Sequence, residues 1–352
     1  MELFDLLERL VEPLGPAGRE DEVREVISGL LAPHAHRLEV DPLGNLQAWL
    51  NPEARPRVML DAHMDEVGFV VQRVEEGGFL RIAPLGGPDP RVLPGAVVSL
   101  QPRPGRRVPG VVGLIPPHVE KAAEAEKALP WERLYVDPGM GDAEAARRAG
   151  LEVGTPGVVE AGRGRLGANC YYARNLDDRV GCALLCHAFI ALAAAPPTFA
   201  LCCNFSVAEE VGLRGATTAA YGVAPDLALA VEATVGDTPG VEPARHPSLL
   251  GRGPAVTVAD GRVVVPWRLV ESLEAAAAAA GIACQRKLPP YGGTDAGAIA
   301  LSRRGVPTAV LSVPTRYIHS PVSLLDLRDL EATAALIQAW LPLAGGLCGA
   351  PA

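Results

Sequence analysis

The sequence predicts an α/β protein, in which a catalytic domain with a mostly parallel sheet and helices on both faces is interrupted by a smaller β-rich domain. After about residue 177, helical and strand patterns alternate, as they do where helices connect parallel strands. Between residues 68 and 167 the pattern changes to short strands and Pro-Gly turns, which is typical of a small barrel or sandwich. A chain of 352 residues is also large for one hydrophobic core. We therefore expect a discontinuous α/β domain at residues 1–67 and 168–352, with the β-rich domain inserted at 68–167.

Composition limits the classes of function. The net charge is −9 and the pI is about 5.4, whereas surfaces that bind nucleic acid or anionic membranes are basic. Charge, Pro or Gly interrupts every apolar run before it reaches membrane-spanning length, and the acidic start at residues 1–5 does not resemble a secretory signal. The seven cysteines form no C-x-x-C pair, which favours free thiols in a reducing compartment. We expect a cytoplasmic protein that binds neither nucleic acid nor membranes.

The first 67 residues are expected to supply two helices and three strands. Apolar residues recur at helical spacing over 3–10 and again over 23–31. Residues 36–50 alternate and are broken by a turn at 41–45, which predicts two strands. The apolar run 58–60 predicts a third strand.

The two remaining parts differ in the kind of element that they are expected to contain. In the insertion we expect a hairpin at 69–74 and 79–82, strands at 97–100 and 108–114, and a short helix at 142–150. In the α/β part we expect helices at 180–194, 213–221, 270–280, 298–304 and 326–340 and strands at 199–207, 227–231 and 308–312. Catalytic groups in such sheets gather at the carboxyl ends of the strands.

Glu209 and Glu210 come directly after one of these expected strands. Carboxylates at the end of a buried strand are costly unless they are paired, bind metal or face a water-filled cleft. Taken alone, two adjacent glutamates most often form a solvated pair that opens a helix. Their significance therefore depends on what other ligand-type residues follow apolar runs.

Two such groups precede the glutamates in the chain. His63 and Asp65 are two residues apart, so on a strand they point to the same face, and Asp65 is placed to orient the imidazole. Asp177 and Asp178 precede an apolar helix, where they either cap it or, in the case of Asp177, bridge two metals. An exposed H-x-D at a strand end is the ordinary interpretation of the first group on its own.

Two more candidates follow the glutamates. Glu232 comes after the strand expected at 227–231, and His319 lies in Arg316–Pro321 after another strand. A surface glutamate and a loop histidine are the ordinary interpretations here. Together, however, the candidates supply one His and one carboxylate for each of two metals, a shared Asp and a free Glu. Two metals about 3.5 Å apart bind a water, lower its pKa and polarise a scissile carbonyl, while a Glu carries the proton to the leaving amine.

These motifs resemble the tetrahedral (TET-type) dinuclear metallo-aminopeptidases, a family that includes glutamyl and deblocking aminopeptidases and some relatives labelled endoglucanase. The resemblance covers essentially the whole chain. The matching stretches are Leu60–Gly68, Gly86–Gly95, Asp177–Arg179, Glu209–Ala216, Gly292–Ala296 and Arg316–Pro321.

The resemblance implies roles for the candidates. Two divalent metal ions would be bound by His63 and Glu232 on one side and Glu210 and His319 on the other, with Asp177 bridging. Asp65 would orient His63, and Glu209 would be the general base. Imidazole and carboxylate ligands suit zinc or cobalt, and also manganese. The inserted domain would mediate dimerisation, and the dimers would build a dodecameric homo-oligomer.

Two positions depart from the family pattern. Glu232 stands where Asp is more common, and its extra methylene is expected to change the position or affinity of that metal. Ser323 stands where an acidic residue usually follows the His-Ser-Pro stretch. Thr294 and Asp295 are candidates for substrate binding, with Asp295 contacting the substrate amine, but a simple turn explains this segment equally well.

The sequence therefore predicts a metal-dependent aminopeptidase that hydrolyses N-terminal residues from peptides. A glycoside hydrolase of the endoglucanase type also uses two carboxylates, but it commonly needs aromatic platforms, and only 5% of the residues are aromatic. A non-catalytic assembly protein that retains the fold is the third alternative. The complete ligand set disfavours it.

Overall fold

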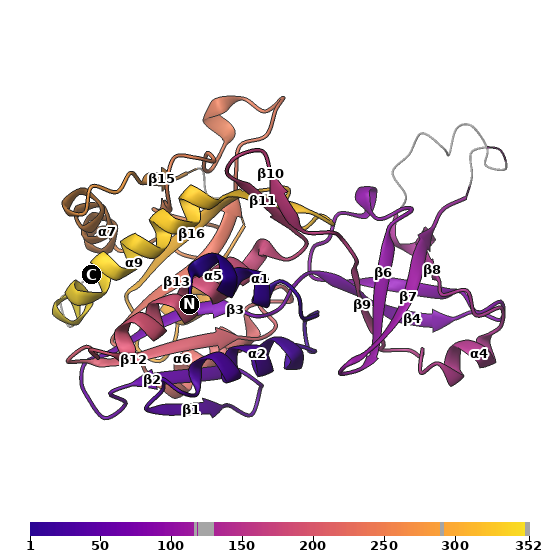
Figure 1. Ribbon diagram of the computed structural model, residues 1–352, viewed down its shortest axis with the longest axis horizontal. Helices are drawn as coiled ribbons and strands as arrows, with labels where there is room; N and C mark the ends of the chain where they lie inside the picture. The colour runs from indigo at the N-terminus through magenta and orange to yellow at the C-terminus, as the bar shows by residue number, and fades with distance from the viewer. Residues whose placement is uncertain (116–117, 119–129, 289–291, 349–352) are drawn as a thin grey trace.

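The computed structural model describes residues 1–115, 118, 130–288 and 292–348. Figure 1 shows a large α/β part, built from both ends of the chain, and a small β-barrel beside it. The predicted α/β class with a β-rich insertion is thus confirmed, and the insertion is a barrel. All six barrel strands lie between residues 68 and 159, and the next strand, β10 (Gly164–Leu166), already pairs within the large sheet.

Four parallel strands form the centre of the large sheet, in the order β12, β3, β13, β16. Their bounds are Ala200–Ser206, Arg57–His63, Leu227–Val235 and Thr308–Arg316. Every residue of β12 is buried, because helices cover both faces of the sheet. Burial on both faces explains why the strand is a nearly unbroken apolar run in the sequence.

Antiparallel strands extend this centre on both sides. On one side lie β2 (Leu46–Leu50) and β1 (Arg37–Val40). On the other lie β17 (Ser323–Asp326), β11 (Cys170–Ala173) and β10, and β14 (Ala255–Thr257) pairs with β16 and with β15 (Gln285–Lys287). Strands β10, β11, β14, β15 and β17 were not predicted. Each has only three or four residues and is held by its partners in the sheet.

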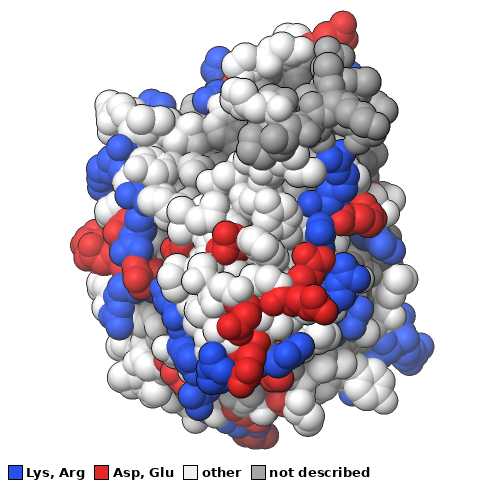
Figure 2. All heavy atoms as spheres, turned by 90° about the vertical axis from the view of Figure 1, so that its right-hand side faces the viewer, with Lys and Arg blue, Asp and Glu red and all other residues white. Residues whose placement is uncertain are grey.

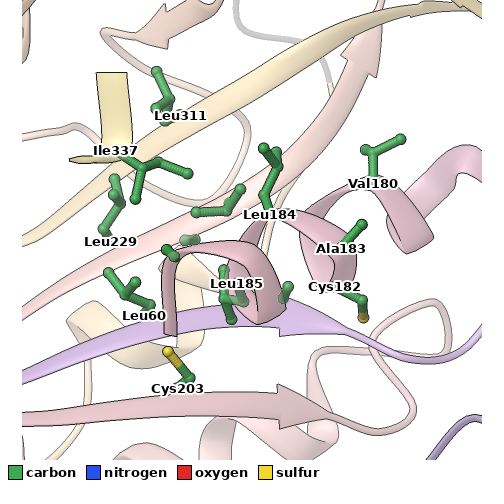
Figure 3. Close-up of a cluster of buried hydrophobic side chains, with 14 of the residues drawn as sticks. Leu60, Val180, Cys182, Ala183, Leu184, Leu185, Cys203, Leu229, Leu311 and Ile337 are labelled. Carbon is green, nitrogen blue, oxygen red and sulfur yellow. The ribbon is translucent and has the colours of Figure 1, made fainter. Parts of the chain in front are cut away.

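Helices cover the two faces of the sheet with two separate clusters of apolar side chains. On one face lie α1 (Leu3–Leu10), α2 (Asp21–Leu31), α5 (Leu176–Ala193) and α9 (Leu327–Leu347), with α7 (Trp267–Ala279) packed on α9. On the other lie α6 (Arg214–Val223) and α8 (Ala296–Ala300). Figure 3 shows part of the larger cluster, where α5 contributes Leu184 and Leu185. Burying a leucine of this kind contributes about 1.5–3 kcal/mol.

Several predicted helix boundaries were wrong. The helix expected at 298–304 spans 296–300, and the last helix continues seven residues beyond 340 to Leu347. The helix expected to begin at Val180 begins at Leu176, with non-helical backbone at Asp177 and Asp178. That interruption lies at a candidate site residue, which is described below.

The barrel has its own apolar core, which includes Phe69, Val98 and Val136. Its strands are β4 (Gly68–Val74), β5 (Leu80–Leu85), β6 (Val97–Arg103), β7 (Arg106–Gly113), β8 (Tyr135–Asp137) and β9 (Pro156–Val159), and α4 (Ala143–Arg148) packs beside them. Figure 2 shows this end of the molecule, where acidic and basic side chains are interspersed with uncharged surface. The described residues on that face therefore form no continuous basic patch of the kind that binds nucleic acid.

Two further sequence features are visible in the fold. All seven cysteines are free, and four of them are buried: Cys182, Cys186, Cys202 and Cys203. No helix in the described part of the chain is long and apolar enough to cross a membrane.

Candidate metal centre

The candidate residues meet at the carboxyl edge of the parallel centre of the sheet. His63 is the last residue of β3, and Glu232 lies on β13. Strand register places Ser206 beside His63 and Ala230 beside Asp61, so Glu232 on β13 is level with the ends of β12 and β3. The remaining candidates follow β12 and β16 or lie at the start of α5: Glu209, Glu210, His319 and Asp177.

Asp177 stands between the two histidines. Its Oδ1 lies 3.2 Å from Nε2 of His63, and its Oδ2 lies 3.5 Å from Nε2 of His319. Beside His63 the next carboxylate oxygen is Oε2 of Glu232, at 3.8 Å from Nε2. Beside His319 it is Oε1 of Glu210, at 3.1 Å from Nε2. The result is two groups of one imidazole and two carboxylates that share Asp177.

The backbone interruption in α5 gives Asp177 this position. Asp177 and Asp178 have non-helical φ and ψ angles, and their peptide bond is cis. The Oδ1 of Asp178 accepts the N–H of Gly181 at 3.0 Å, which is a helix cap, and its Oδ2 accepts the N–H of His63 at 3.3 Å. Asp178 therefore caps the helix, and the Asp177 carboxylate is left to face both imidazoles.

Asp65 contacts both His63 and the backbone of the two glutamates, whereas the sequence predicted only its contact with His63. The Nδ1 of His63 lies 3.1 Å from the carbonyl oxygen of Asp65 and 3.5 Å from its Oδ1. The same carboxylate accepts the backbone N–H groups of Glu209 at 2.9 Å and Glu210 at 3.1 Å. A proton on Nδ1 of His63 leaves Nε2 free as a ligand, and Asp65 also fixes the segment that carries both glutamates.

The side chain of Arg179 stabilises the segment that follows His63. This side chain is fully buried and donates to the carbonyl oxygens of Met64, Leu10 and Pro13, and to Oε1 of Glu66. These bonds fix the chain between His63 and Glu66 against the end of α1. A buried guanidinium with several acceptors is a stable arrangement, because its charge and its N–H groups are compensated.

The electrostatics of the cluster point to an excess of negative charge. Burial raises the pKa of Glu209, Glu210 and Glu232. Burial would also raise the pKa of Asp177, but hydrogen bonds from His319 and His63 outweigh it, so that this pKa is lowered. For both imidazoles, neighbouring carboxylates outweigh the opposite effect of burial and raise the pKa. The three glutamates and the two histidines therefore bind protons more strongly than free side chains do, as expected for a negatively charged site that a cation would neutralise.

The donor set fits divalent metal ions. Ligand atoms of His63, Asp177 and Glu232, and likewise those of Asp177, Glu210 and His319, lie within 4.8 Å of one another. Among the described residues, the buried Oε1 of Glu210 has no hydrogen-bonding neighbour other than Nε2 of His319 at 3.1 Å, so both atoms are available as ligands. Carboxylate oxygens and imidazole nitrogens bind zinc, cobalt and manganese.

A cleft of about 180 Å³ opens over this cluster. Thr294 lines it, and its hydroxyl donates to Oδ2 of Asp260 at 3.0 Å. Asp295, in contrast, is fully buried, and its Oδ2 accepts the Ser206 hydroxyl at 2.6 Å, while its N–H donates to Oε1 of Glu232 at 3.4 Å. The Asp295 carboxylate is therefore bonded to the end of β12 and does not line the cleft.

Two other residues complete the surroundings. Ser323 is buried on β17 and donates its hydroxyl to the carbonyl oxygen of Tyr317 at 3.3 Å, two residues before His319. Lys287, at the end of β15, lines the cleft, and sequence reasoning missed it. No motif surrounds Lys287, and only the pairing of a three-residue strand brings it to the cleft.

Imidazole and carboxylate side chains gathered at the carboxyl edge of a parallel sheet are the arrangement expected of an α/β metallohydrolase. The comparisons with known proteins are more specific. The chain belongs to the M42 glutamyl aminopeptidase family, whose sequence profile matches residues 44–336. It is therefore a member of an aminopeptidase family, and the predicted resemblance is confirmed.

Related proteins match nearly the whole chain. It is 33% identical to the lysyl aminopeptidase of Pyrococcus furiosus and 32% identical to the glutamyl aminopeptidase of Lactococcus lactis subsp. cremoris, with 96% of each chain covered in both comparisons. Among solved structures it is similar to a TET aminopeptidase from a marine-sediment thaumarchaeote, with a TM-score of 0.93 and 32% identity over 99% of this chain and 97% of that one. The TET1 peptidase of Pyrococcus horikoshii, which can assemble into a tetrahedron or a large octahedral shell, matches with a TM-score of 0.87 and 31% identity over 97% and 99%.

Proposed function

We propose that this protein is an aminopeptidase that removes N-terminal residues from peptides with the help of two divalent metal ions. The observation that carries the proposal is the position of Asp177, whose two carboxylate oxygens face two imidazoles, each of which has a further carboxylate beside it. Membership of the M42 family supports the exopeptidase assignment.

The proposed ligands divide into two overlapping groups. His63, Asp177 and Glu232 would hold one ion, and Asp177, Glu210 and His319 would hold the other. Ions of this kind lower the pKa of a bound water and polarise a carbonyl group. Zinc or cobalt is the proposed metal, with manganese as the alternative. Asp65 contributes by fixing the imidazole of His63 and the backbone of both glutamates.

Glu209 is the proposed general base. Its Oε2 lies 4.0 Å from Nε2 of His63, and its side chain is mostly buried at the cleft. The two proposed ligand groups do not include it, although its carboxylate also lies near the ligand atoms of His63 and Glu210. Its Oε2 would take a proton from the attacking water and return it to the leaving amine, a transfer that typically contributes 10²–10⁴-fold.

The neighbouring candidates have different proposed parts. Thr294 would contact substrate, since it lies on the cleft wall. Asp295 would act indirectly, because its N–H holds one oxygen of Glu232 and its carboxylate is buried.

The barrel is the proposed contact between subunits, in dimers that build a dodecamer. Val97 and Val111 are paired across β6 and β7, and both are about half exposed, at 51% and 45%. The assemblies formed by the Pyrococcus horikoshii relative support the same proposal. A monomer in sedimentation velocity at micromolar concentration would contradict it. We also propose a cytoplasmic location, in keeping with seven free thiols.

The activity is tested by depleting the protein of metal and assaying aminoacyl-anilides before and after addition of zinc, cobalt or manganese. We expect activity to disappear with the chelator and to return with one or more of these metals. A soluble β-glucan serves as the control substrate, because hydrolysis of the glucan in the presence of chelator would favour a glycosidase instead.

A further inference from the structure

One buried cation in the cleft has no partner among the described residues. Lys287 is 4% exposed and lines the cleft, yet within the described part of the chain its ammonium makes no hydrogen bond and no ion pair. Its neighbour on β15, Arg286, is exposed and forms an ion pair with Glu274. Side chains alternate along a strand, so Arg286 points away from the face on which Lys287 lies.

The sheet sets the separation between Lys287 and the candidate ligands. β15 pairs with β14, β14 with β16, and β16 with β13, which carries Glu232. Three inter-strand steps put the backbone of Lys287 about 14 Å from the backbone of β13. The ligands and Lys287 border the same cleft of about 180 Å³, whose lining also includes the small residues Ala233, Thr234 and Gly293. A cleft of this volume can hold a substrate side chain.

The nearby carboxylates are already engaged. Asp260 accepts the N–H groups of Arg262 and Val263 on Oδ1 and the Thr294 hydroxyl on Oδ2. Glu232 and Asp177 face the imidazoles. Burial lowers the pKa of Lys287, an effect that Asp260, Glu232 and Asp177 oppose. An ammonium desolvated in this way gains most from an anion supplied by a ligand.

We propose that Lys287 binds a carboxylate of the substrate, namely the side-chain carboxylate of an N-terminal glutamate or aspartate. The inference rests on the proposed peptidase function and adds the residue that selects the substrate. Relatives named glutamyl and lysyl aminopeptidases are similarly distant from this chain, so family membership does not decide the preference. The α-carboxylate of a dipeptide has the same chemistry and is the competing source.

The test compares kcat/KM for Glu-, Leu- and Lys-anilides, which carry no C-terminal carboxylate. We expect the natural protein to prefer the Glu substrate. Lys287→Met should lower the Glu-to-Leu ratio by about 30-fold or more, because it removes one partner of a buried charge pair. Lys287→Arg should retain the preference, and Lys287→Glu should move it towards the Lys substrate. Arg286→Met removes a neighbouring charge that points away from the cleft and should leave the ratio unchanged.

Calorimetry gives a readout that does not depend on turnover. L-glutamate should bind the metal-loaded protein more tightly than L-methionine, and Lys287→Met should abolish the difference. A melting temperature and a metal content close to those of the natural protein would show that each variant is folded.

Three results would overturn the inference. The first is a higher kcat/KM of the natural protein for the Leu-anilide than for the Glu-anilide, and the second is a Glu-to-Leu ratio that Lys287→Met leaves unchanged. The third is a Lys287→Met effect seen only when hydrolysis of Leu-Leu is compared with that of Leu-Leu-amide, which would assign Lys287 to the α-carboxylate. Failure of the peptidase proposal looks different, since no anilide or peptide would be hydrolysed with any metal. The glutamate titration decides the role of Lys287 even in that case.

Discussion

Replacement of Asp65 by Asn tests whether this carboxylate positions the two glutamates. In the natural protein one oxygen accepts the N–H of Glu209 and the other accepts the N–H of Glu210. Asparagine has a single side-chain oxygen, so it can accept only one of these N–H groups. Its amide NH₂ would then face the other N–H, donor against donor.

The magnitude follows from the bond that is lost. A hydrogen bond to a charged group contributes about 1.5–3 kcal/mol, and an unsatisfied buried donor costs a similar amount. If this free energy no longer holds Glu209 in its catalytic position, kcat/KM falls by roughly 10- to 150-fold. The imidazole of His63 also loses a carboxylate neighbour at 3.5 Å, so we expect weaker metal binding as well.

The assay is kcat/KM on an anilide substrate at saturating metal, together with metal titration by calorimetry. Asp329 provides a matched control, because its carboxylate also accepts two backbone N–H groups, those of Gly251 and Gly253, but it does not line the cleft. Asp329→Asn should keep kcat/KM within about 3-fold on this reasoning. If Asp65→Asn also stays within that range, Asp65 does not position the glutamates.

Three other predictions concern separate parts of the molecule. Glu209→Gln should lower kcat by on the order of 10²-fold or more without loss of bound metal, because the base is not a ligand; near-normal turnover would remove Glu209 from the mechanism. One oxygen of Glu232 accepts the Asp295 N–H and only the other faces His63, so we expect the weaker metal affinity there. Glu232→Asp, the residue more common in the family, should tighten that site alone in a calorimetric titration, whereas two equal sites in the natural chain would contradict this. Burial, with a contribution from the charge of Asp65, raises the pKa of Glu20 to about 7 from 4.5. The folded protein then holds a proton that the unfolded chain releases, so the stability of the metal-free protein should fall as pH rises from 4.5 through 7, by up to about 3 kcal/mol. Urea unfolding at pH 5 and pH 8 should show a smaller difference for Glu20→Gln, and an equal difference would exclude Glu20 as its source.

The elements that could be predicted from the sequence are those whose pattern is local. Strands β3, β12, β13 and β16 are apolar runs because both of their faces are covered. Their ends therefore mark the sheet edge, and His63, Glu209, Glu210 and Glu232 could be assigned to it as candidates. Helical spacing predicted α1 and α2 in the same way.

The remainder depends on contacts between distant segments. Three-residue strands such as β14 and β15 have too few residues for a recognisable period, so the approach of Lys287 to the cleft could not be seen. The contact of Asp65 with the two glutamates could not be predicted either, because its carboxylate oxygens accept N–H groups more than 140 residues away along the chain. For Asp295 the motif showed an acidic residue in a turn, and only the packing of Ser206 against it shows where its carboxylate points.

The spread of the candidate ligands along the chain has a consequence for biosynthesis. The first is His63 and the last is His319, so a ribosome must translate a further 256 residues after His63 before the second imidazole exists. His319 also depends on β16 being threaded between β13 and β17, and β17 is completed only at residue 326. A nascent or prematurely released chain therefore lacks the full constellation. If the proposed two-metal site carries the activity, that activity cannot appear before the chain has been synthesised as far as residue 326.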